Sequence, residues 1–208
     1  MAYVLGFFVA DGCLTKNSKR NNYYIDFTST DYDVIRYIRK ILSAKQKISK
    51  RWRVGDRKQA YRLQIGSKKI YSDLLSLGMT RNKSKSITYP DIPNVYFSDF
   101  LRGYFDGDGY SNCTDYWRSD RRKYSRLFFC GFVSGSKKFL SGLRSQIKKL
   151  IRIGDGSLHD HNNNYALVYS GSDTGKIYNF MYNGLVNKVC LRRKYDKFTD
   201  DIADILGS

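Results

Sequence analysis

Two aspartates, Asp11 and Asp108, are the residues of this chain whose setting best suits chemistry. Each closes a short segment of apolar and small residues and is followed by glycine, in VLGFFVADG at residues 4–12 and LRGYFDGDG at residues 101–109. If both segments are helical, each carboxylate lies in the last turn, at the negative end of the helix dipole, where it is disfavoured. Two such carboxylates brought together would repel each other unless a cation lay between them, which predicts a divalent metal site.

Small residues in the same segments indicate how the two helices pack. Gly6 and Ala10 are four residues apart, as are Gly103 and Gly107, so each helix has a strip with almost no side chain. Such strips let two backbones approach closely. Taken singly, either segment could be an ordinary buried helix with an Asp-Gly turn, but the presence of both favours a paired site. Two glycines are expected to end these helices in the left-handed conformation, Gly12 and Gly109.

The repeat extends over most of the chain. Asp11 and Asp108 are offset by 97 residues, whereas later matched positions are offset by 104 to 106. The second copy therefore has about 8 extra residues after its Asp-Gly. A period this long suits an internally duplicated protein rather than a solenoid. The matched pairs are Phe27 with Phe132, Tyr61 with Tyr165, Gly78 with Gly184, and Lys83 with Lys188.

The two segments resemble the signature of LAGLIDADG homing endonucleases, in the single-chain form that carries two motifs. The eighth-position acid, which that family uses to hold metal, is present in both copies, whereas the sixth-position acid is Asp106 in the second and is replaced by Val9 in the first. The resemblance implies an α+β fold of two pseudo-twofold αββαββα units. The motif helices would pack at the centre, and two antiparallel sheets would form a DNA-binding saddle. The expected divisions are a first repeat at 1–85, a linker at 86–98 and a second repeat at 99–208.

The resemblance also implies an activity. A meganuclease of this kind is a divalent-metal-dependent endodeoxyribonuclease that hydrolyses both strands of a long, asymmetric double-stranded DNA site during intron homing. Asp11 and Asp108 would hold Mg²⁺, helped by the backbone carbonyls of Ala10 and Gly107. Mn²⁺ would be tolerated, and Ca²⁺ would support binding without turnover. Two lysines would support the reaction, Lys83 and Lys188, with Lys85, Arg192 and Arg193 as rivals and ordinary phosphate-contacting charge as the alternative role.

Two other functions use the same fold. An intron RNA maturase would bind RNA and need no metal site, and a DNA-binding regulator would have an inactive centre. Both would tolerate loss of a motif acid, but Asp11 and Asp108 are both present. The sequence therefore favours the nuclease.

The charge of the chain agrees with a nucleic-acid partner. The formal net charge is +18, with +12 in residues 1–97 and +6 in residues 98–208, so both halves are basic. No apolar run is long enough to span a membrane, and the apolar start lacks a basic leader, so we expect an intracellular protein, in a bacterial or archaeal cytoplasm or an organelle, and not a secreted one. The four cysteines lack metal-site spacing and are expected to be free thiols. With two motifs in one chain, a monomer without a protein partner is expected.

Hydrophobic periodicity predicts the remaining elements of each copy. Strands are expected at 22–29 and 126–134, and helices at 31–42, 68–77 and 137–151. Hairpins are expected at 47–66 and 156–170, followed by a helix up to Gly184 and a last helix at 199–206. His159 and His161 are interpreted as part of a solvated hairpin turn rather than a metal pair.

Alternation along these strands predicts a polar face in the first copy. Arg62 and Gln64 point away from Tyr61, Leu63 and Ile65, and their types suit guanine and adenine readout. A solvated polar face is the alternative. In the second copy the matching residues are Ala166 and Val168, which suit contact with thymine methyl groups or no contact.

The segment 110–126, which contains the extra residues of the second copy, is predicted to form a lengthened loop in which basic and aromatic residues are interleaved. Such a mixture can grip phosphates and stack on sugars or bases. The candidate DNA-binding residues of the whole chain are Lys16, Lys19, Arg20, Lys47, Ser49, Arg51, Arg53, Arg62, Gln64, Trp117, Arg118, Arg121, Arg122, Lys123 and Arg126.

Overall fold

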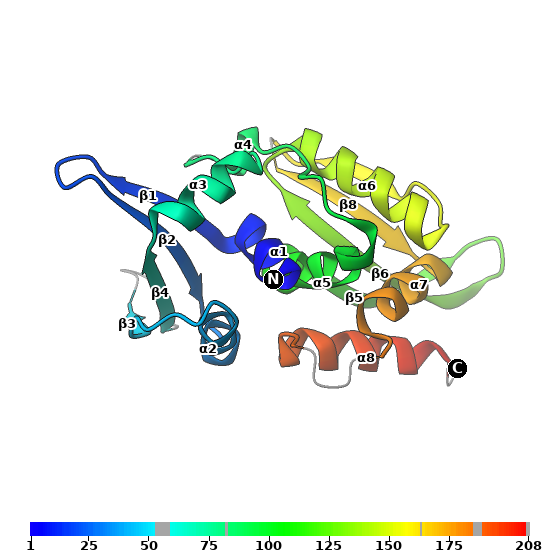
Figure 1. The fold of residues 1–208 in the computed structure, drawn as a ribbon. Helices are drawn as coiled ribbons and strands as arrows, with labels where there is room; N and C mark the ends of the chain where they lie inside the picture. The colour runs from blue at the N-terminus through cyan, green and yellow to red at the C-terminus, as the bar shows by residue number, and fades with distance from the viewer. Residues whose placement is uncertain (53–58, 82, 163, 185–188, 207–208) are drawn as a thin grey trace.

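The structure is a computed structural model, which describes residues 1–208 except 53–58, 82, 163, 185–188 and 207–208. It has an α+β fold with two four-stranded antiparallel sheets on either side of a central pair of helices (Figure 1). The strand orders are β1-β2-β4-β3 and β5-β6-β8-β7, so the two sheets have the same topology. The predicted duplicated αββαββα architecture is confirmed.

The first unit contains α1 (Ala2–Asp11), β1 (Gly12–Asn17), β2 (Asn22–Ser29), α2 (Tyr32–Ile41), β3 (Ser49–Arg51), β4 (Ala60–Gly66), α3 (Lys68–Ser76) and α4 (Lys83–Ser86). A short 3-10 helix, η1 (Asn94–Tyr96), leads into the second unit. That unit contains α5 (Phe97–Asp108), β5 (Gly109–Arg118), β6 (Lys123–Ser134), α6 (Lys137–Ile151), β7 (Ser157–Asp160), β8 (Tyr165–Ser170), α7 (Ser172–Tyr182) and α8 (Arg192–Leu206).

Strand register shows that the copies are equivalent residue by residue near the motifs. Gly12 lies opposite Phe27 in the first sheet, and Gly109 lies opposite Phe132 in the second. On the next strand, Phe27 lies opposite Leu63, just as Phe132 lies opposite Leu167. The insertion therefore does not disturb the pairing beside the motif helices.

The helices form where capping and apolar spacing agree. The Ser67 side chain accepts a hydrogen bond from Ile70 N at 3.2 Å at the start of α3, and Ser136 accepts one from Phe139 N at 3.3 Å at the start of α6. These contacts satisfy backbone donors that the first turn leaves without partners. One face of α6 is fully buried, with Phe139, Leu140, Leu143 and Ile147 at helical spacing.

The motif helices cross through their glycines, as the sequence predicts. A Cβ atom added to Gly6 would overlap the carbonyl oxygen of Phe100, and one added to Gly103 would overlap the carbonyl oxygen of Tyr3. Both obstacles are backbone atoms, which cannot rotate out of the way. The contact therefore holds α1 and α5 side by side at backbone distance (Figure 1).

Replacing Gly103 with alanine should therefore lower the free energy of unfolding by about 3 kcal/mol, because the two helix backbones must separate. Gly175 provides a matched control, since it lies within α7 and an added Cβ meets no atom within 4 Å. Gly175→Ala should stabilise the protein by roughly 0.5–1 kcal/mol through helix propensity. Chemical denaturation of the three proteins measures both effects, and equal stability of the two variants would contradict the packing argument.

The glycines that follow the motif acids have a different role from the predicted one. Gly12 has φ −82° and Gly109 has φ −87°, so neither adopts the left-handed conformation. Instead, a Cβ atom at either position would overlap an aromatic ring, that of Phe8 or that of Phe105 respectively. Glycine is required because the backbone passes directly from helix into strand at both positions, and the buried phenylalanine ring occupies the space that a side chain would need.

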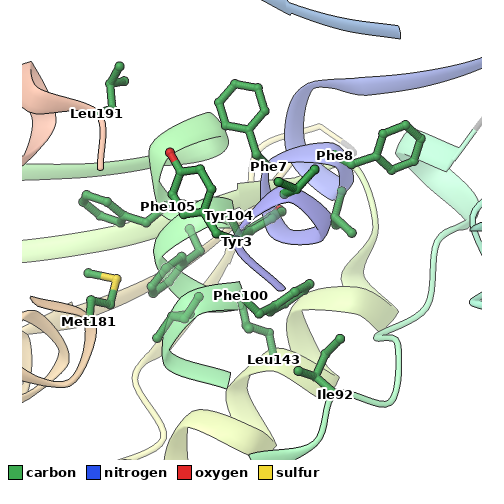
Figure 2. Close-up of a cluster of buried hydrophobic side chains, with 14 of the residues drawn as sticks. Tyr3, Phe7, Phe8, Ile92, Phe100, Tyr104, Phe105, Leu143, Met181 and Leu191 are labelled. Carbon is green, nitrogen blue, oxygen red and sulfur yellow. The ribbon is translucent and has the colours of Figure 1, made fainter. Parts of the chain in front are cut away.

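Aromatic side chains form the core around the helix crossing (Figure 2). Tyr104 of α5 is buried, and its ring lies 4.8 Å from that of Phe139 in α6, while Phe105 lies 5.2 Å from Phe198 in α8. On the other side, Phe8 of α1 packs edge-on against Phe27 at 5.7 Å. The core is therefore continuous from one sheet, through the motif helices, to the other.

Two elements near the C-terminal half differ from the predictions. Residues 110–126 are not a loop: they extend β5 and β6 into a long hairpin with a turn at 119–122. The last helix, α8, begins at Arg192 rather than 199, and it packs against β5 and β6. Within the described part of the chain, no helix combines the length and apolarity needed to cross a bilayer.

Candidate active site and nucleic-acid interface

The carboxylates of the two motifs lie at adjacent helix ends. Asp11 is the last residue of α1 and is exposed, and Asp108 is the last residue of α5 and is half-buried. A Cβ atom added to Gly107 would lie 3.4 Å from Asp11 Oδ2, so the Asp11 carboxylate reaches across to the end of α5. The glycine at 107 makes room for Ala10, because an added Cβ would lie 2.3 Å from the Ala10 Cβ.

A lysine that was not among the predicted site residues lies at the same place. The ammonium of Lys194, in the first turn of α8, donates to the carbonyls of Phe105 at 2.9 Å, Gly107 at 2.8 Å and Gly109 at 2.7 Å. These carbonyls are at the negative end of α5, where a cation is favourable.

The site couples Lys194 electrostatically to three carboxylates. Burial lowers the pKa of the Lys194 ammonium to about 8, with Arg193 acting in the same direction. The carboxylates of Asp106, Asp11 and Asp108 oppose that shift by stabilising the charged form. Lys194 is thus a half-buried cation placed within the field of both motif acids.

Asp106, the sixth-position acid of the second motif, is buried and holds three segments together. Its Oδ2 accepts hydrogen bonds from the Tyr3 hydroxyl of α1 and from the backbone N–H of Leu191, both at 2.7 Å. Burial raises the pKa of this carboxyl to about 6, although these two hydrogen bonds and the charges of Lys194 and Arg102 lower it. Leu191 directly precedes α8, so Asp106 fixes the point from which Lys194 reaches the site.

The predicted catalytic lysines are placed as follows. Lys83 is the first residue of α4, and Lys188 lies outside the described residues. Among their rivals, Arg192 pairs with Asp196 at 2.9 Å, and Arg193 pairs with Asp31 at 3.0 Å, across to the start of α2. Lys85 is exposed in α4.

Helical spacing could have identified Lys194. It follows the buried Leu191 by three residues and precedes the buried Phe198 by four, so it lies on the buried face of α8. A lysine on the buried face of a helix requires specific acceptors. The predicted start of this helix at 199 hid the pattern.

The residues at the helix ends suit a hard divalent cation. The described residues contain no cluster of three or more His, Cys or Asp side chains that could hold a metal. Asp11 and Asp108 are only two side chains, and backbone carbonyls would supply the other ligands. All of these donors are oxygens, which Mg²⁺ and Ca²⁺ prefer. That the Gly107 carbonyl already accepts from an ammonium shows that this helix end attracts positive charge. The carboxylates of Asp11 and Asp108 and the carbonyls of Ala10 and Gly107 therefore suit a divalent metal ion.

The face of the first sheet that the helices leave uncovered carries four of the nine DNA-binding residues predicted in that half. Ser49 lies opposite Arg62 in the β3–β4 ladder, and Arg51 and Gln64 lie two residues further along their strands, so all four share one face. Lys47 is exposed just before β3, and Arg53 lies outside the described residues.

One predicted DNA-binding residue of this sheet, Lys16, lies on the face that the helices cover. The Lys16 ammonium lies 5.1 Å from the centre of the Tyr23 ring, which packs against Tyr71 of α3. Lys16 therefore shares the helix-covered face, because side chains alternate along β1. Lys19 and Arg20 are exposed in the turn between β1 and β2.

The long hairpin of the second sheet divides its basic and aromatic residues between two faces. Trp117 lies opposite Tyr124, with rings 5.2 Å apart, and Arg126 Nε donates to Asp115 Oδ1 at 3.0 Å. Because side chains alternate along a strand, these residues lie on the same face of the sheet as the buried Phe128. They are exposed in the part of the hairpin furthest from the core. The remaining predicted residues are Arg118 and Lys123 on the open face, and Arg121 and Arg122 in the turn.

Arg118 is already paired within the hairpin, since its guanidinium donates to Asp120 at 2.7 and 3.0 Å. Period-two counting from β6 could have separated the faces, but it needs the strand to be recognised as far as Lys123. The four cysteines have free thiols, as predicted. His159 lies in β7, opposite Ala166, rather than in the predicted turn, and His161 lies in the turn that follows; both are exposed.

Comparison with known proteins agrees with this architecture. Residues 1–77 match the family profile described as a LAGLIDADG-like domain. No curated protein sequence matches the chain. Among solved structures, I-SmaMI bound to an uncleaved DNA target in the presence of calcium ions has a TM-score of 0.66 at 13% identity, over 98% of this chain and 90% of that one.

Two further structures are similar over nearly their whole length. The I-LtrWI LAGLIDADG homing endonuclease bound to target DNA has a TM-score of 0.62 at 11% identity, covering 99% of this chain and 90% of that one. The LAGLIDADG meganuclease I-AabMI bound to uncleaved DNA has a TM-score of 0.64 at 14% identity, covering 100% and 91%. The fold is that of a meganuclease. More specifically, this chain has the single-chain, two-motif LAGLIDADG homing endonuclease fold.

Proposed function

We propose that this protein is a site-specific homing endonuclease that hydrolyses both strands of a long, asymmetric DNA site. The observation that carries the proposal is the meeting of Asp11, Asp108 and Lys194 at the ends of the two motif helices. These groups combine a seat for hard cations with a half-buried positive charge, which is what phosphodiester hydrolysis requires.

In this proposal, each half of the chain binds one half of the target. The first repeat, 1–85, and the second repeat, 99–208, are joined by the linker at 86–98, so a single chain suffices and a monomer is expected. The open sheet faces would contact the bases, and the basic hairpin turns would contact phosphates. Each half would read about one helical turn.

In this proposal, the motif acids and Lys194 have different roles in the reaction. Asp11 and Asp108, with the carbonyls of Ala10 and Gly107, would hold Mg²⁺, which when bound lowers the pKa of a water molecule and stabilises the leaving oxygen. Lys194 would stabilise negative charge as it develops on the phosphate, because its ammonium is held in place by three carbonyls. Its position at the end of α5 supports it for this role.

The proposal is tested by incubating the purified protein with a plasmid library of randomised sites. In Mg²⁺ a subset of plasmids should be linearised, and sequencing of the cut ends should give one asymmetric site. In Ca²⁺ the same sites should be bound but left intact. A protein that binds such DNA but leaves it uncut in Mg²⁺ and in Mn²⁺ would act as a regulator, and preferential binding of structured RNA would indicate a maturase.

DNA binding should weaken steeply with salt. A chain of net charge +18 that clasps a duplex displaces many condensed counterions, so log K should fall linearly with log salt concentration. If six to ten phosphates are contacted, we expect roughly a thousandfold loss or more between 50 and 200 mM salt. Fluorescence anisotropy in Ca²⁺ measures the slope, and a flat dependence would contradict a nucleic-acid partner.

A further inference from the structure

One buried acid lies on the open, polar face of the first sheet. Asp26 in β2 is only 5% exposed, although its strand neighbours on that face are the candidate base readers. A carboxylate here opposes the attraction of a basic protein for phosphate. Its position therefore calls for a role other than general affinity.

The Asp26 carboxylate is the centre of a hydrogen-bond network. Its Oδ1 accepts from Arg62 Nε at 2.6 Å and forms an ion pair with Arg62 Nη2. Its Oδ2 accepts from Thr15 Oγ1 at 3.1 Å and from Gln64 Nε2 at 3.4 Å. Charge-assisted contacts of this kind fix the orientation of a planar guanidinium.

The way Arg62 is held leaves one edge of its guanidinium for DNA. A guanidinium has five N–H donors, and Asp26 takes the edge formed by Nε and Nη2. The outer edge, formed by Nη1 and the second hydrogen of Nη2, keeps the parallel pair of donors that matches guanine O6 and N7. The Arg62 side chain is 19% exposed, so only part of it reaches the surface.

The second sheet has no such network. The residue equivalent to Asp26 is Gly131, and a Cβ atom there would lie 2.6 Å from the Tyr110 hydroxyl oxygen, because the Tyr110 ring lies over the glycine. The residues equivalent to Arg62 and Gln64 are Ala166 and Val168. Any effect of the network should therefore appear in one half of the target only.

We propose that Asp26 is a specificity-determining positioning residue: it holds Arg62 with its outer edge toward the major groove, so that the first sheet selects guanine at one position of its half-site. The proposal rests on the proposed function, because it assumes that this face binds DNA. Without Asp26, Arg62 would be free to turn to the nearest phosphate, and guanine would no longer be selected.

The test compares variants on duplexes carrying the site that the wild-type protein selects from a randomised library. Each base pair is changed in turn, and binding is measured in Ca²⁺. Wild-type protein should prefer guanine at one position of one half-site by roughly ten- to a hundredfold. Asp26→Asn and Arg62→Lys should both lose that preference and keep the preferences elsewhere. Asp26→Asn should also steepen the salt slope by about one phosphate contact.

The matched control is Asp115→Asn, which releases Arg126 from a similar cross-strand pair in the other sheet. It should leave the guanine preference unchanged. In an Arg62→Ala background, Asp26→Asn should have no further effect on base preference, because the role of Asp26 is exerted through Arg62. The double variant Arg62→Ala/Asp26→Asn removes both charges together, so, unlike either single variant, it leaves no buried charge unpaired.

Two results would overturn the proposal while the proposed function stands. One is an unchanged guanine preference in Asp26→Asn. The other is a uniform loss of preference at every position, together with a lowered melting temperature, which would give Asp26 a structural role only. If the wild-type protein selects no sequence from the library, the proposed function fails as well.

Discussion

Asp11→Asn and Asp108→Asn should each reduce DNA cleavage by on the order of a thousandfold or more, and they should leave DNA binding within a few-fold of wild type. Each substitution removes a negative charge from a helix end where two acids meet, so the seat for a divalent cation is lost. Asparagine keeps the size of the side chain, so the crossing of α1 and α5 should be unaffected. The added loss of repulsion toward phosphate can only favour binding.

Single-turnover cleavage of a supercoiled plasmid carrying the selected site measures this effect and separates nicking from double-strand cleavage. Asp33→Asn is the control, because Asp33 is an exposed acid of α2 that pairs with Arg36 at 3.2 Å. It should cleave at the wild-type rate. The assignment of the two acids is wrong if either motif variant still cuts both strands as fast as that control.

The features that the sequence predicted best are those that depend on a repeated local pattern. Gly6 and Gly103 could be recognised as crossing points because the same small residues recur in both copies. The equivalence of Phe27 and Phe132, which the strand register confirms, followed from the same comparison. In a duplicated chain, each copy can be compared with the other, so a pattern that occurs in both is more informative than one that occurs once.

The features that were missed depend on contacts between segments far apart in the chain. Lys194 is recognisable as a site residue only when α8 lies against the end of α5, 85 to 89 residues earlier in the sequence. The pairing of Asp26 with Arg62 likewise joins neighbouring strands that are 36 residues apart. Helical spacing places Lys194 on the buried face of α8, but no local spacing rule identifies its carbonyl acceptors or the partner of Asp26.

The faces of the long hairpin were missed for a different reason. Trp117 and Arg126 are basic or aromatic residues in a polar stretch, which reads as a loop by composition. In the structure, strand pairing continues to Arg118 and Lys123, so alternation decides which side each residue faces.

Lys194 is the residue for which the structure changes the expected mechanism most. Its ammonium is held by three carbonyls at the end of α5, and burial lowers its pKa to about 8 while the motif acids oppose that shift. The three N–H donors of this ammonium are taken by the three carbonyls, so its positive charge is fixed in place and would stabilise developing charge through its electrostatic field without reorganisation. The catalytic role predicted for Lys83 and Lys188 rests on sequence alignment alone.

Lys194→Met should therefore reduce cleavage by roughly a hundred- to a thousandfold, with little change in DNA affinity. The loss of three hydrogen bonds will also destabilise the start of α8, so stability must be separated from chemistry. Lys197 makes this possible, because its ammonium, one turn further along α8, donates to the Ser111 carbonyl at 2.8 Å. Lys197→Met should lower stability in a similar way and leave the single-turnover cleavage rate unchanged. Equal rates in the two variants would show that Lys194 only fastens α8 to the motif helix, and the charge needed for catalysis would then have to come from another residue.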